Sequence, residues 1–466
     1  MQAATDYNGK TALVVGAGRS GLAASDFLIG WGARVILTDS KDRGDLDEAS
    51  IASIESTVKS GMLELELGGH RPGSFESCDF VVISPGVPLT LVEFDLCRKA
   101  GIPILTEVEL AFRHLQGRII GISGSNGKTT TTTLVAELLR QAGIKAYAAG
   151  NIGLPLTNFV DASTRDDIYV VELSSFQLEG ITDFRPWIGS LLNVTPDHLD
   201  RYESFGQYAA AKSRMFLNQE TTDYAVLNRD DALVAAMAVD MRSKPFWFSR
   251  MDAVRQGACV KDNRVVFCDR ERETDLFPVS AIRLMGSHNL ENTLAACTMA
   301  ILAGAPPETL ERGIRQFKGV EHRIEFVAEI DGVRYFNDSK ATNVEAAVKS
   351  IESFGDSIVM IAGGRDKGAD FSVLKDPLRK RGKYLVLIGE AAGAIRDALG
   401  NDVETSEAAT IQEAVQLCGQ HAEAGDVVLL APACASFDMF RDYEHRGRVF
   451  KDAVRKLKQS SGKDIP

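Results

Sequence analysis

The sequence has few cysteines, no CxxC pair and no excess of basic residues, and each of these deficits excludes a class of protein. Its seven cysteines are an odd number without metal-ligand spacing, which argues against a disulfide framework or a zinc site. No window approaches the roughly 20 uninterrupted apolar residues of a membrane span. The opening residues MQAATDYNGK lack the pattern of a secretory signal. The net charge of −12 argues against nucleic acid as a bulk partner. We therefore expect a cytoplasmic protein that contacts neither membranes nor nucleic acids and captures phosphate only at local sites.

The chain does contain a series of short apolar runs that end in glycine or proline, with helical patterns between them. This alternation is typical of α/β structure with mostly parallel sheets. The alternation of strand and helix patterns restarts near residues 106 and 320. We therefore expect three α/β domains, at residues 1–106, 107–319 and 320–466. Within the third, Asp331-Gly332 predicts the turn of a β-hairpin. The apolar runs occupy residues 11–18, 34–40, 80–88, 118–124, 168–175, 188–195, 357–364, 383–390 and 426–433.

Residues 121–134 read GISGSNGKTTTTTL, a glycine-rich stretch between a strand pattern and an amphipathic helix pattern. Gly121 and Gly127 are six positions apart, whereas the GxxxxGK[ST] phosphate loop has five. The chemistry is retained, because glycines let backbone amides face phosphate oxygens at a helix N-terminus. Lys128 suits the β- and γ-phosphates of a nucleotide, and the Thr129 hydroxyl suits Mg²⁺. The alternative is a structural turn before a threonine-capped helix.

A second glycine motif, GAGRSG at residues 16–21, follows the first strand pattern and has Asp39 about 20 residues downstream. Alone, this motif predicts an NAD-dependent dehydrogenase. A dehydrogenase would leave the phosphate loop at residues 121–134 without a task, whereas an enzyme with two phosphorylated ligands needs both motifs. Asp39 has an alternative role as the cap of the turn that follows it.

The order of many sequence blocks resembles that of the Mur ligases, which add amino acids to the peptidoglycan precursor. The resemblance covers essentially the whole chain. Its phosphate loop reads GSNGKTTT, whereas the alanine-adding members typically read GTHGKTTT, and the chain has no DNPR tetrapeptide, which is expected of the diaminopimelate- or lysine-adding members. The other blocks are GNIG (150–153), VVELSSFQLE (170–179), NVTPDHLDRY (193–202), YAAAKSRMF (208–216), GSHNLENTLAA (286–296), EHR (321–323), NDSKATN (337–343), AGGRDKGADF (362–371) and APACASFDMF (431–440).

The resemblance implies a Rossmann-like UDP-binding first domain, a central P-loop ATPase-type domain and a Rossmann-like third domain that binds the amino acid. It implies a monomeric, ATP-dependent ligase that joins UDP-N-acetylmuramoyl-L-alanine to D-glutamate through an acyl phosphate. The first glycine motif then takes the UDP diphosphate and the second takes ATP. The related folylpolyglutamate synthetases share the ATP loop, but they would have no use for a uridine-binding domain. Because the site residues come from three domains, we expect the third to swing about a hinge near residue 320.

Two Mg²⁺ ions are implied beside the phosphate loop. Glu172 ends an apolar strand pattern, which brings a carboxylate to the sheet edge beside the loop, and His198 follows the next strand pattern. By resemblance both bind Mg²⁺ with Thr129; alone, they would be a cap carboxylate and a surface imidazole. Lys212 lies on a helical pattern, where a solvated lysine is the common outcome. Since Mg²⁺ repels a bare ammonium, the resemblance implies that Lys212 carries a carbamate made from CO₂ and holds the second ion.

The remaining roles are assigned by resemblance, and the base that deprotonates the incoming amine stays unassigned. The ATP-binding residues are Gly124, Ser125, Asn126, Gly127, Lys128, Thr129, Thr130, Asn289, Asn292, Arg323, Asp338 and Lys340. The residues for the UDP substrate are Arg19, Ser20, Asp39, Ser40, Lys41, Gly86, Asn151 and His198. Those for D-glutamate are Thr342, Lys367, Ser436 and Tyr443. The catalytic set is Lys128, Asn151, Glu172, His198, Lys212 and Arg323.

Overall fold

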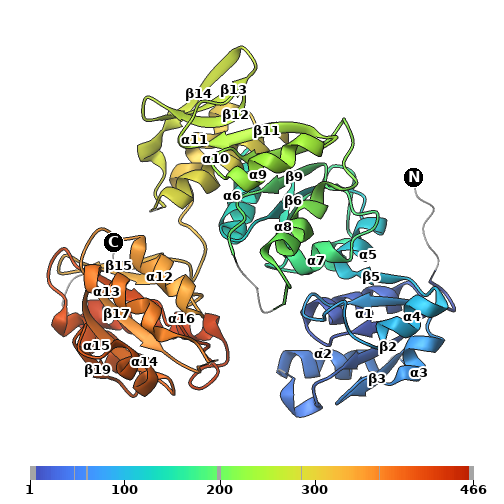
Figure 1. Cartoon of the computed structure of the whole chain (residues 1–466), viewed down its shortest axis with the longest axis horizontal. Helices are drawn as coiled ribbons and strands as arrows, with labels where there is room; N and C mark the ends of the chain where they lie inside the picture. Colours follow the sequence, from blue (N-terminus) through green and yellow to red (C-terminus); the bar gives the residue numbers. More distant parts are fainter. Residues whose placement is uncertain are drawn as a thin grey trace. The chain divides into compact units, whose positions relative to one another are not determined.

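The chain folds into two compact units that together contain three β-sheets (Figure 1). The computed structural model describes residues 7–46, 48–58, 61–196, 201–284, 286–366 and 368–460. The first unit comprises the chain up to Ile282 together with His288–Gln316. The second comprises Arg283–Ser287 and the chain from Phe317 onward. The first unit holds two of the sheets, and the expected α/β class with mostly parallel strands is confirmed.

The first sheet has the order β3-β2-β1-β4-β5, and all of its strand pairs are parallel. Both faces are buried, because Val14 in β1 belongs to one hydrophobic cluster and its neighbour Val15 belongs to another. The strand order reverses between β1 and β4, where ligands of such sheets bind at the carboxyl ends of the strands. The elements are β1 (Thr11–Val15), α1 (Arg19–Gly30), β2 (Arg34–Asp39), η1 (Arg43–Asp45), α2 (Glu48–Val58), β3 (Leu63–Leu67), α3 (Pro72–Ser77), β4 (Phe80–Ile83), α4 (Phe94–Ala100), β5 (Ile104–Thr106) and α5 (Glu107–His114).

The second sheet has nine strands in the order β14-β13-β12-β11-β10-β9-β6-β8-β7. It is parallel from β7 to β12, and β13 and β14 extend it in antiparallel fashion. The first half comprises β6 (Arg118–Ser123), α6 (Lys128–Gln141), β7 (Ala146–Gly150), η2 (Leu156–Phe159), β8 (Ile168–Glu172), α7 (Ser175–Glu179), β9 (Ile188–Leu191), α8 (Phe205–Ser213) and η3 (Arg214–Phe216). The second half comprises β10 (Tyr224–Asn228), α9 (Ala232–Met237), η4 (Ala238–Asp240), β11 (Lys244–Ser249), β12 (Gln256–Lys261), β13 (Arg264–Asp269), β14 (Arg272–Pro278), η5 (Val279–Ala281), α10 (Ser287–Leu302) and α11 (Pro307–Gln316).

The antiparallel extension is absent from the sequence-based prediction. Asp262 and Asn263 join β12 to β13 with φ angles of 49° and 58°. Two consecutive left-handed residues are the requirement of a type I′ hairpin, and aspartate and asparagine tolerate that conformation better than most residues. The signal was therefore present in the sequence as a polar KDN step between two apolar runs.

The third sheet, in the second unit, has the order β15-β16-β20-β17-β18-β19. The expected hairpin joins β15 to β16 antiparallel, with φ of 50° at Asp331 and 80° at Gly332, and the other pairs are parallel. The elements are β15 (Glu325–Ile330), β16 (Val333–Asn337), α12 (Val344–Glu352), β17 (Ile358–Gly363), η6 (Phe371–Leu374), α13 (Lys375–Arg381), β18 (Gly382–Ile388), α14 (Ala392–Leu399), β19 (Thr405–Glu407), α15 (Ile411–His421), β20 (Val427–Leu430) and α16 (Tyr443–Ser460).

Within the first unit, aromatic side chains that precede β1 and follow α1 contact His114, the last residue of α5. Tyr7 OH and His114 Nε2 are 2.8 Å apart, and the Trp31 ring lies 4.8 Å from the His114 ring, centroid to centroid. Trp31 Nε1 also donates to Asp161 at 2.8 Å. All seven cysteines are free and buried. Among the described residues, no helix combines the length and the apolar character needed to cross a membrane.

Candidate active site

The predicted phosphate loop lies between β6 and α6, at the carboxyl edge of the second sheet. Two of its glycines adopt left-handed backbone angles, with φ of 153° at Gly124 and 84° at Gly127. A Cβ added at Gly127 would lie 2.2 Å from Asn292 Oδ1, so a side chain there is excluded by both backbone and space. Gly127 is the N-cap of the 14-residue α6, so the loop lies at the positive end of the helix dipole, which favours an anion.

Asn193 fixes the backbone of this loop, and the sequence prediction missed it. Its Oδ1 accepts from Asn126 N at 2.8 Å and its Nδ2 donates to Asn126 O at 3.1 Å. Its own carbonyl accepts from Ser125 N at 3.0 Å. Ser125 Oγ in turn donates to Thr195 O at 2.9 Å. The segment after β9 therefore serves as a template for the loop.

The Lys128 side chain folds back over the loop. Its Nζ donates to the carbonyl oxygens of Gly124 and Ser125, at 2.8 and 3.0 Å. The ammonium is therefore held in the loop itself, where it can compensate the negative charge of a phosphoryl group. Thr129, the next residue, is buried at the start of α6.

Glu172 ends β8 beside the loop and presents one unsatisfied carboxylate oxygen. Asn151 Nδ2 donates to Glu172 Oε1 at 3.0 Å, while in the described part of the chain Glu172 Oε2 is buried without a hydrogen-bond partner. A buried carboxylate oxygen that lacks a donor suits a divalent cation. Glu172 therefore fits the expected Mg²⁺ site, with Asn151 holding its other oxygen, and the ion would offset charge on phosphate oxygens. His198 lies outside the described residues.

Lys212 approaches the same loop from α8, which confirms the predicted helix at this position. The side chain is only 1% exposed, so the solvated lysine considered from the sequence is wrong. Its Nζ donates to Gly124 O at 2.9 Å and lies 4.6 Å from the centre of the Tyr208 ring. A lysine is rarely buried so deeply, and here the burial brings its amine to the phosphate loop.

Asn289 and Asn292, two of the predicted ATP-binding residues, are three positions apart on α10 and therefore share one face of the helix. Asn292 Nδ2 donates to Asn289 Oδ1 at 3.2 Å. Asn292 is buried, and its side-chain amide packs directly against Gly127, which leaves no space for a Cβ at that glycine. The structure thus brings Asn292 to the phosphate loop, with Asn289 one helical turn away.

The first glycine motif lies at the carboxyl edge of the first sheet. Gly16 has φ of 100°, and a Cβ on Gly21 would lie 1.8 Å from Gly16 O. Asp39, at the end of β2, accepts from Ala17 N at 2.7 Å and from Lys41 N at 2.9 Å. Asp39 therefore fixes the glycine loop and caps the turn after β2. Arg19 and Ser20 begin α1, Ser40 and Lys41 follow β2, and Gly86 follows β4, all at this edge.

In the second unit, the segments after β16 and β20 carry most of the predicted residues: Asp338, Lys340, Thr342, Ser436 and Tyr443. Burial raises the pKa of Asp338 despite the hydrogen bond from Ser350 Oγ. Lys340 Nζ lies 5.4 Å from the centre of the Tyr443 ring. Arg323 lies just before β15, and Lys367 lies outside the described residues.

Arg446 on α16 joins these two segments and was not predicted. Its guanidinium is fully buried and donates to Ser339 Oγ at 3.0 Å and Ser339 O at 2.9 Å. It also donates to the carbonyls of Cys434 and Ala435, at 3.1 and 3.3 Å. Burial lowers the pKa of Arg446 to about 10. From sequence alone, nothing separates this arginine from the other basic residues of α16.

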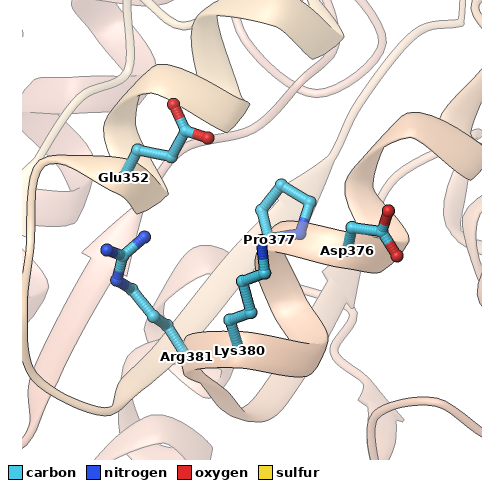
Figure 2. Close-up of a pocket in the computed structure, with 5 residues that line it drawn as sticks. All are labelled: Glu352, Asp376, Pro377, Lys380 and Arg381. Carbon is cyan, nitrogen blue, oxygen red and sulfur yellow. The ribbon is translucent and has the colours of Figure 1, made fainter.

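A surface depression of about 290 Å³ lies elsewhere in the second unit (Figure 2). Its lining residues are Glu352, Asp376, Pro377, Lys380 and Arg381. Glu352 is the last residue of α12, whereas Thr342 lies before the start of this helix. The length of α12, roughly 13 Å, therefore separates the depression from Thr342. None of the predicted site residues that the structure describes lines it.

Three family profiles match successive parts of the chain. They are described as "Mur ligase MurD-like, N-terminal domain" for residues 10–106, "Mur ligase middle domain" for residues 122–300 and "Mur ligase, glutamate ligase domain" for residues 322–434. A protein of Koribacter versatilis is 45% identical over 98% of this chain and 100% of its own length. One of Acidobacterium capsulatum is 47% identical over 96% of this chain and 97% of its own length. Both are named UDP-N-acetylmuramoylalanine--D-glutamate ligase.

Solved structures of distant relatives share the fold. UDP-N-acetylmuramate-alanine ligase MurC from Thermotoga maritima superimposes with a TM-score of 0.57 at 18% identity, covering 96% of this chain and 100% of its own. A pseudomurein peptide ligase type C from Methanothermus fervidus gives a TM-score of 0.57 at 17% identity, with the same coverage. The family profiles and the near-full-length relatives together lead to one conclusion: the chain belongs to the Mur ligase family.

Proposed function

We propose that this protein is the ATP-dependent ligase that joins UDP-N-acetylmuramoyl-L-alanine to D-glutamate. The observation that carries the proposal is the phosphate loop. The Gly124 carbonyl accepts hydrogen bonds from both Lys128 and Lys212, and at the end of the adjacent strand Glu172 Oε2 has no hydrogen-bond partner among the described residues. The near-full-length relatives named for this reaction support the choice of substrates. Family membership removes the basis for the dehydrogenase interpretation of the first glycine motif.

The reaction proceeds in two steps. The terminal carboxylate oxygen of the UDP substrate attacks the γ-phosphorus of ATP, and the bond to the β,γ-bridging oxygen breaks to release ADP. The amine of D-glutamate then attacks the acyl carbon, inorganic phosphate leaves, and the nitrogen loses a proton. Lys128 and the amides at the start of α6 stabilise the negative charge on the transferring group. Asn151 orients Glu172 through the hydrogen bond at 3.0 Å.

Lys212 is proposed to act as a carbamate. Its buried ammonium first releases one proton, and the nitrogen then attacks the carbon of CO₂ and releases a second, which leaves a carbamate anion at the phosphate loop. That anion, with Thr129, Glu172 and His198, would hold two Mg²⁺ ions, which supply charge compensation for the phosphoryl group. The deep burial of Lys212 and its contact with Gly124 support this role.

The binding sites for the UDP portion of the first substrate and for D-glutamate are proposed to lie in the first and third domains. Arg19, Ser20, Asp39, Ser40, Lys41 and Gly86 would bind the UDP portion, with Asn151 and His198 towards its muramoyl end. Thr342, Lys367, Ser436 and Tyr443 would bind D-glutamate, and Asn289, Asn292, Arg323, Asp338 and Lys340 would bind ATP with the loop residues. The corresponding domains are proposed to span residues 1–106, 107–319 and 320–466, in a cytoplasmic monomer.

Release of inorganic phosphate tests the function directly. The purified protein, supplied with Mg²⁺ and ATP, should release phosphate only when UDP-N-acetylmuramoyl-L-alanine and D-glutamate are both present. L-Glutamate, D-alanine and meso-diaminopimelate serve as parallel amino acids. Phosphate release with one of these instead of D-glutamate would refute the proposed substrate. No release with D-glutamate or with any of the three parallel amino acids would refute the proposed function.

A further inference from the structure

The turn that carries Arg323 has an unusual backbone. His322 and Ile324, the residues on either side, adopt φ angles of 65° and 43°. Left-handed angles are uncommon outside glycine, and for a β-branched residue such as isoleucine they are a genuine outlier. Such a backbone persists only where the surrounding structure over-determines it, and outliers of this kind cluster at functional sites.

Glu325 is the centre of the contacts that impose this turn. Its Oε2 accepts from His322 N at 3.0 Å and from Asn337 Nδ2 at 3.0 Å. Asn337 Nδ2 also lies 2.8 Å from His322 Nδ1, so one amide binds both the carboxylate and the imidazole. His322 is buried, and its ring packs directly against the backbone of Gly447, where an added Cβ would lie 2.1 Å from His322 Nδ1.

Lys451 on α16 completes the arrangement. Its Nζ donates to Glu325 Oε1 at 3.0 Å and to Glu321 Oε1. The lysine side chain is 10% exposed and that of Glu325 is 21% exposed, so the pair is much less screened by solvent than a surface ion pair. Lys451 therefore ties the residues before and after the turn to one helix.

The same residues resemble a metal site. Glu321, His322 and Glu325 each offer a ligand atom, and these atoms lie within 4.8 Å of one another. Two observations argue against a bound ion. The Lys451 ammonium already bridges the two carboxylates, and Asn337 Nδ2 lies at the imidazole nitrogen. The cluster thus carries its own cation, which a metal ion would have to displace.

We infer that Lys451 and Glu325 are positioning residues that hold the 322–324 turn, and through it Arg323, in the conformation that binds ATP. The inference rests on the proposed function, since the contact of Arg323 with the nucleotide is part of it. The turn is also joined to the next predicted ATP segment, because Lys340 N donates to His322 O at 3.2 Å. The turn carries Arg323 itself, whereas it reaches the predicted D-glutamate residue Tyr443 only through a ring contact of His322. Loss of Lys451 should therefore affect the nucleotide more than the amino acid.

Substitution Lys451→Met removes the charge and keeps the length of the side chain. The KM for ATP should rise about tenfold, the scale on which misplacement of a binding group acts. The KM for D-glutamate should change less than twofold, and Lys451→Arg should restore the KM for ATP. In an Arg323→Lys background the effect of Lys451→Met should shrink to less than twofold, because the two residues act through one contact. Lys456→Met, an exposed lysine of the same helix, is the matched control.

Each outcome decides the inference. An unchanged KM for ATP, or equal increases for ATP and D-glutamate together with a lower melting temperature, would assign Lys451 a general structural role and overturn it. If Lys451→Met fails to fold, Glu325→Gln, which keeps the side-chain shape, is read by the same criteria. The wild-type assay separates this inference from the proposed function. If wild type releases no phosphate, the proposed function is refuted. If wild type releases phosphate, the variants decide the role of Lys451.

Discussion

Lys128 and Lys212 share one acceptor, since both side-chain amines donate to the carbonyl oxygen of Gly124, at 2.8 and 2.9 Å. The two nitrogens therefore lie close together, and two like charges in a partly desolvated site are unfavourable. For Lys128 the proposed function favours a cation, because its amine would face the phosphate groups of ATP. The unfavourable pair is removed if the more buried amine, Lys212, becomes an anion.

The first prediction follows from that relationship. Lys212→Ala should lower kcat about 1,000-fold, as expected for loss of a group that organises charge at the phosphoryl site. Phosphate release measures the effect, and Lys145→Ala, an exposed lysine near α6, should be neutral. After incubation with ¹³C-bicarbonate, wild type should show a carbamate ¹³C resonance that Lys212→Ala lacks. A Mg²⁺-loaded enzyme with full turnover and no such resonance would contradict the carbamate.

A second prediction concerns the space at Gly127. Gly127→Ala should raise the KM for ATP at least tenfold, because a Cβ there would displace the Asn292 amide, 2.2 Å away, and strain a backbone with φ of 84°. Gly143→Ala separates the two causes. Its φ is 80°, yet nothing lies within 4 Å of an added Cβ. It should cost about 1 kcal/mol of stability and leave the KM unchanged. Equal kinetic effects of both variants would mean that backbone strain, not Asn292, is responsible.

A third prediction tests Asn193 as the template of the phosphate loop. Asn193→Ala removes the two side-chain hydrogen bonds to Asn126, so the loop loses its fixed geometry and kcat/KM for ATP should fall about tenfold. Asn218→Ala is the matched control. Its amide also makes two backbone hydrogen bonds, to Thr182 and Phe184, away from the loop. Both variants should lose about 1–2 kcal/mol of stability, and a similar kinetic loss for Asn218→Ala would dismiss the template role.

How far the sequence predicts this site depends on the kind of information each residue carries. Gly127, Lys128 and Glu172 are visible because a local pattern places them: glycine at a helix start, lysine next, and a carboxylate at the end of an apolar strand. Asp39 is a mixed case, since the spacing identifies the residue but its partners, Ala17 N and Lys41 N, are set by the turn.

Asn193 and Arg446 could not be predicted, because their roles depend on contacts between segments far apart in sequence. Asn193 meets a loop 67 positions away, and Arg446 donates to Ser339, 107 positions away. Neither residue type is unusual for its local pattern. Only the sheet topology shows that Asn193 follows the strand beside the loop and that Arg446 lies under two segments at one sheet edge.

The last prediction concerns pH and the aromatic contact around His114. Burial lowers the pKa of His114 below its ordinary 6.5, and the positive charge of neighbouring Arg113 lowers it further. As the pH falls through 6.5, the unfolded chain binds a proton that the folded chain refuses, so acidification destabilises the fold. Trp31 lies 4.8 Å away, and Trp187 and Trp247 belong to the same unit, so tryptophan fluorescence reports unfolding of the first unit. Between pH 7.5 and 5.5, His114→Asn should lose up to about 1 kcal/mol less stability than wild type. His421→Asn, in the second unit, should behave as wild type in this signal, and an unaltered acid sensitivity in His114→Asn would show that another group titrates.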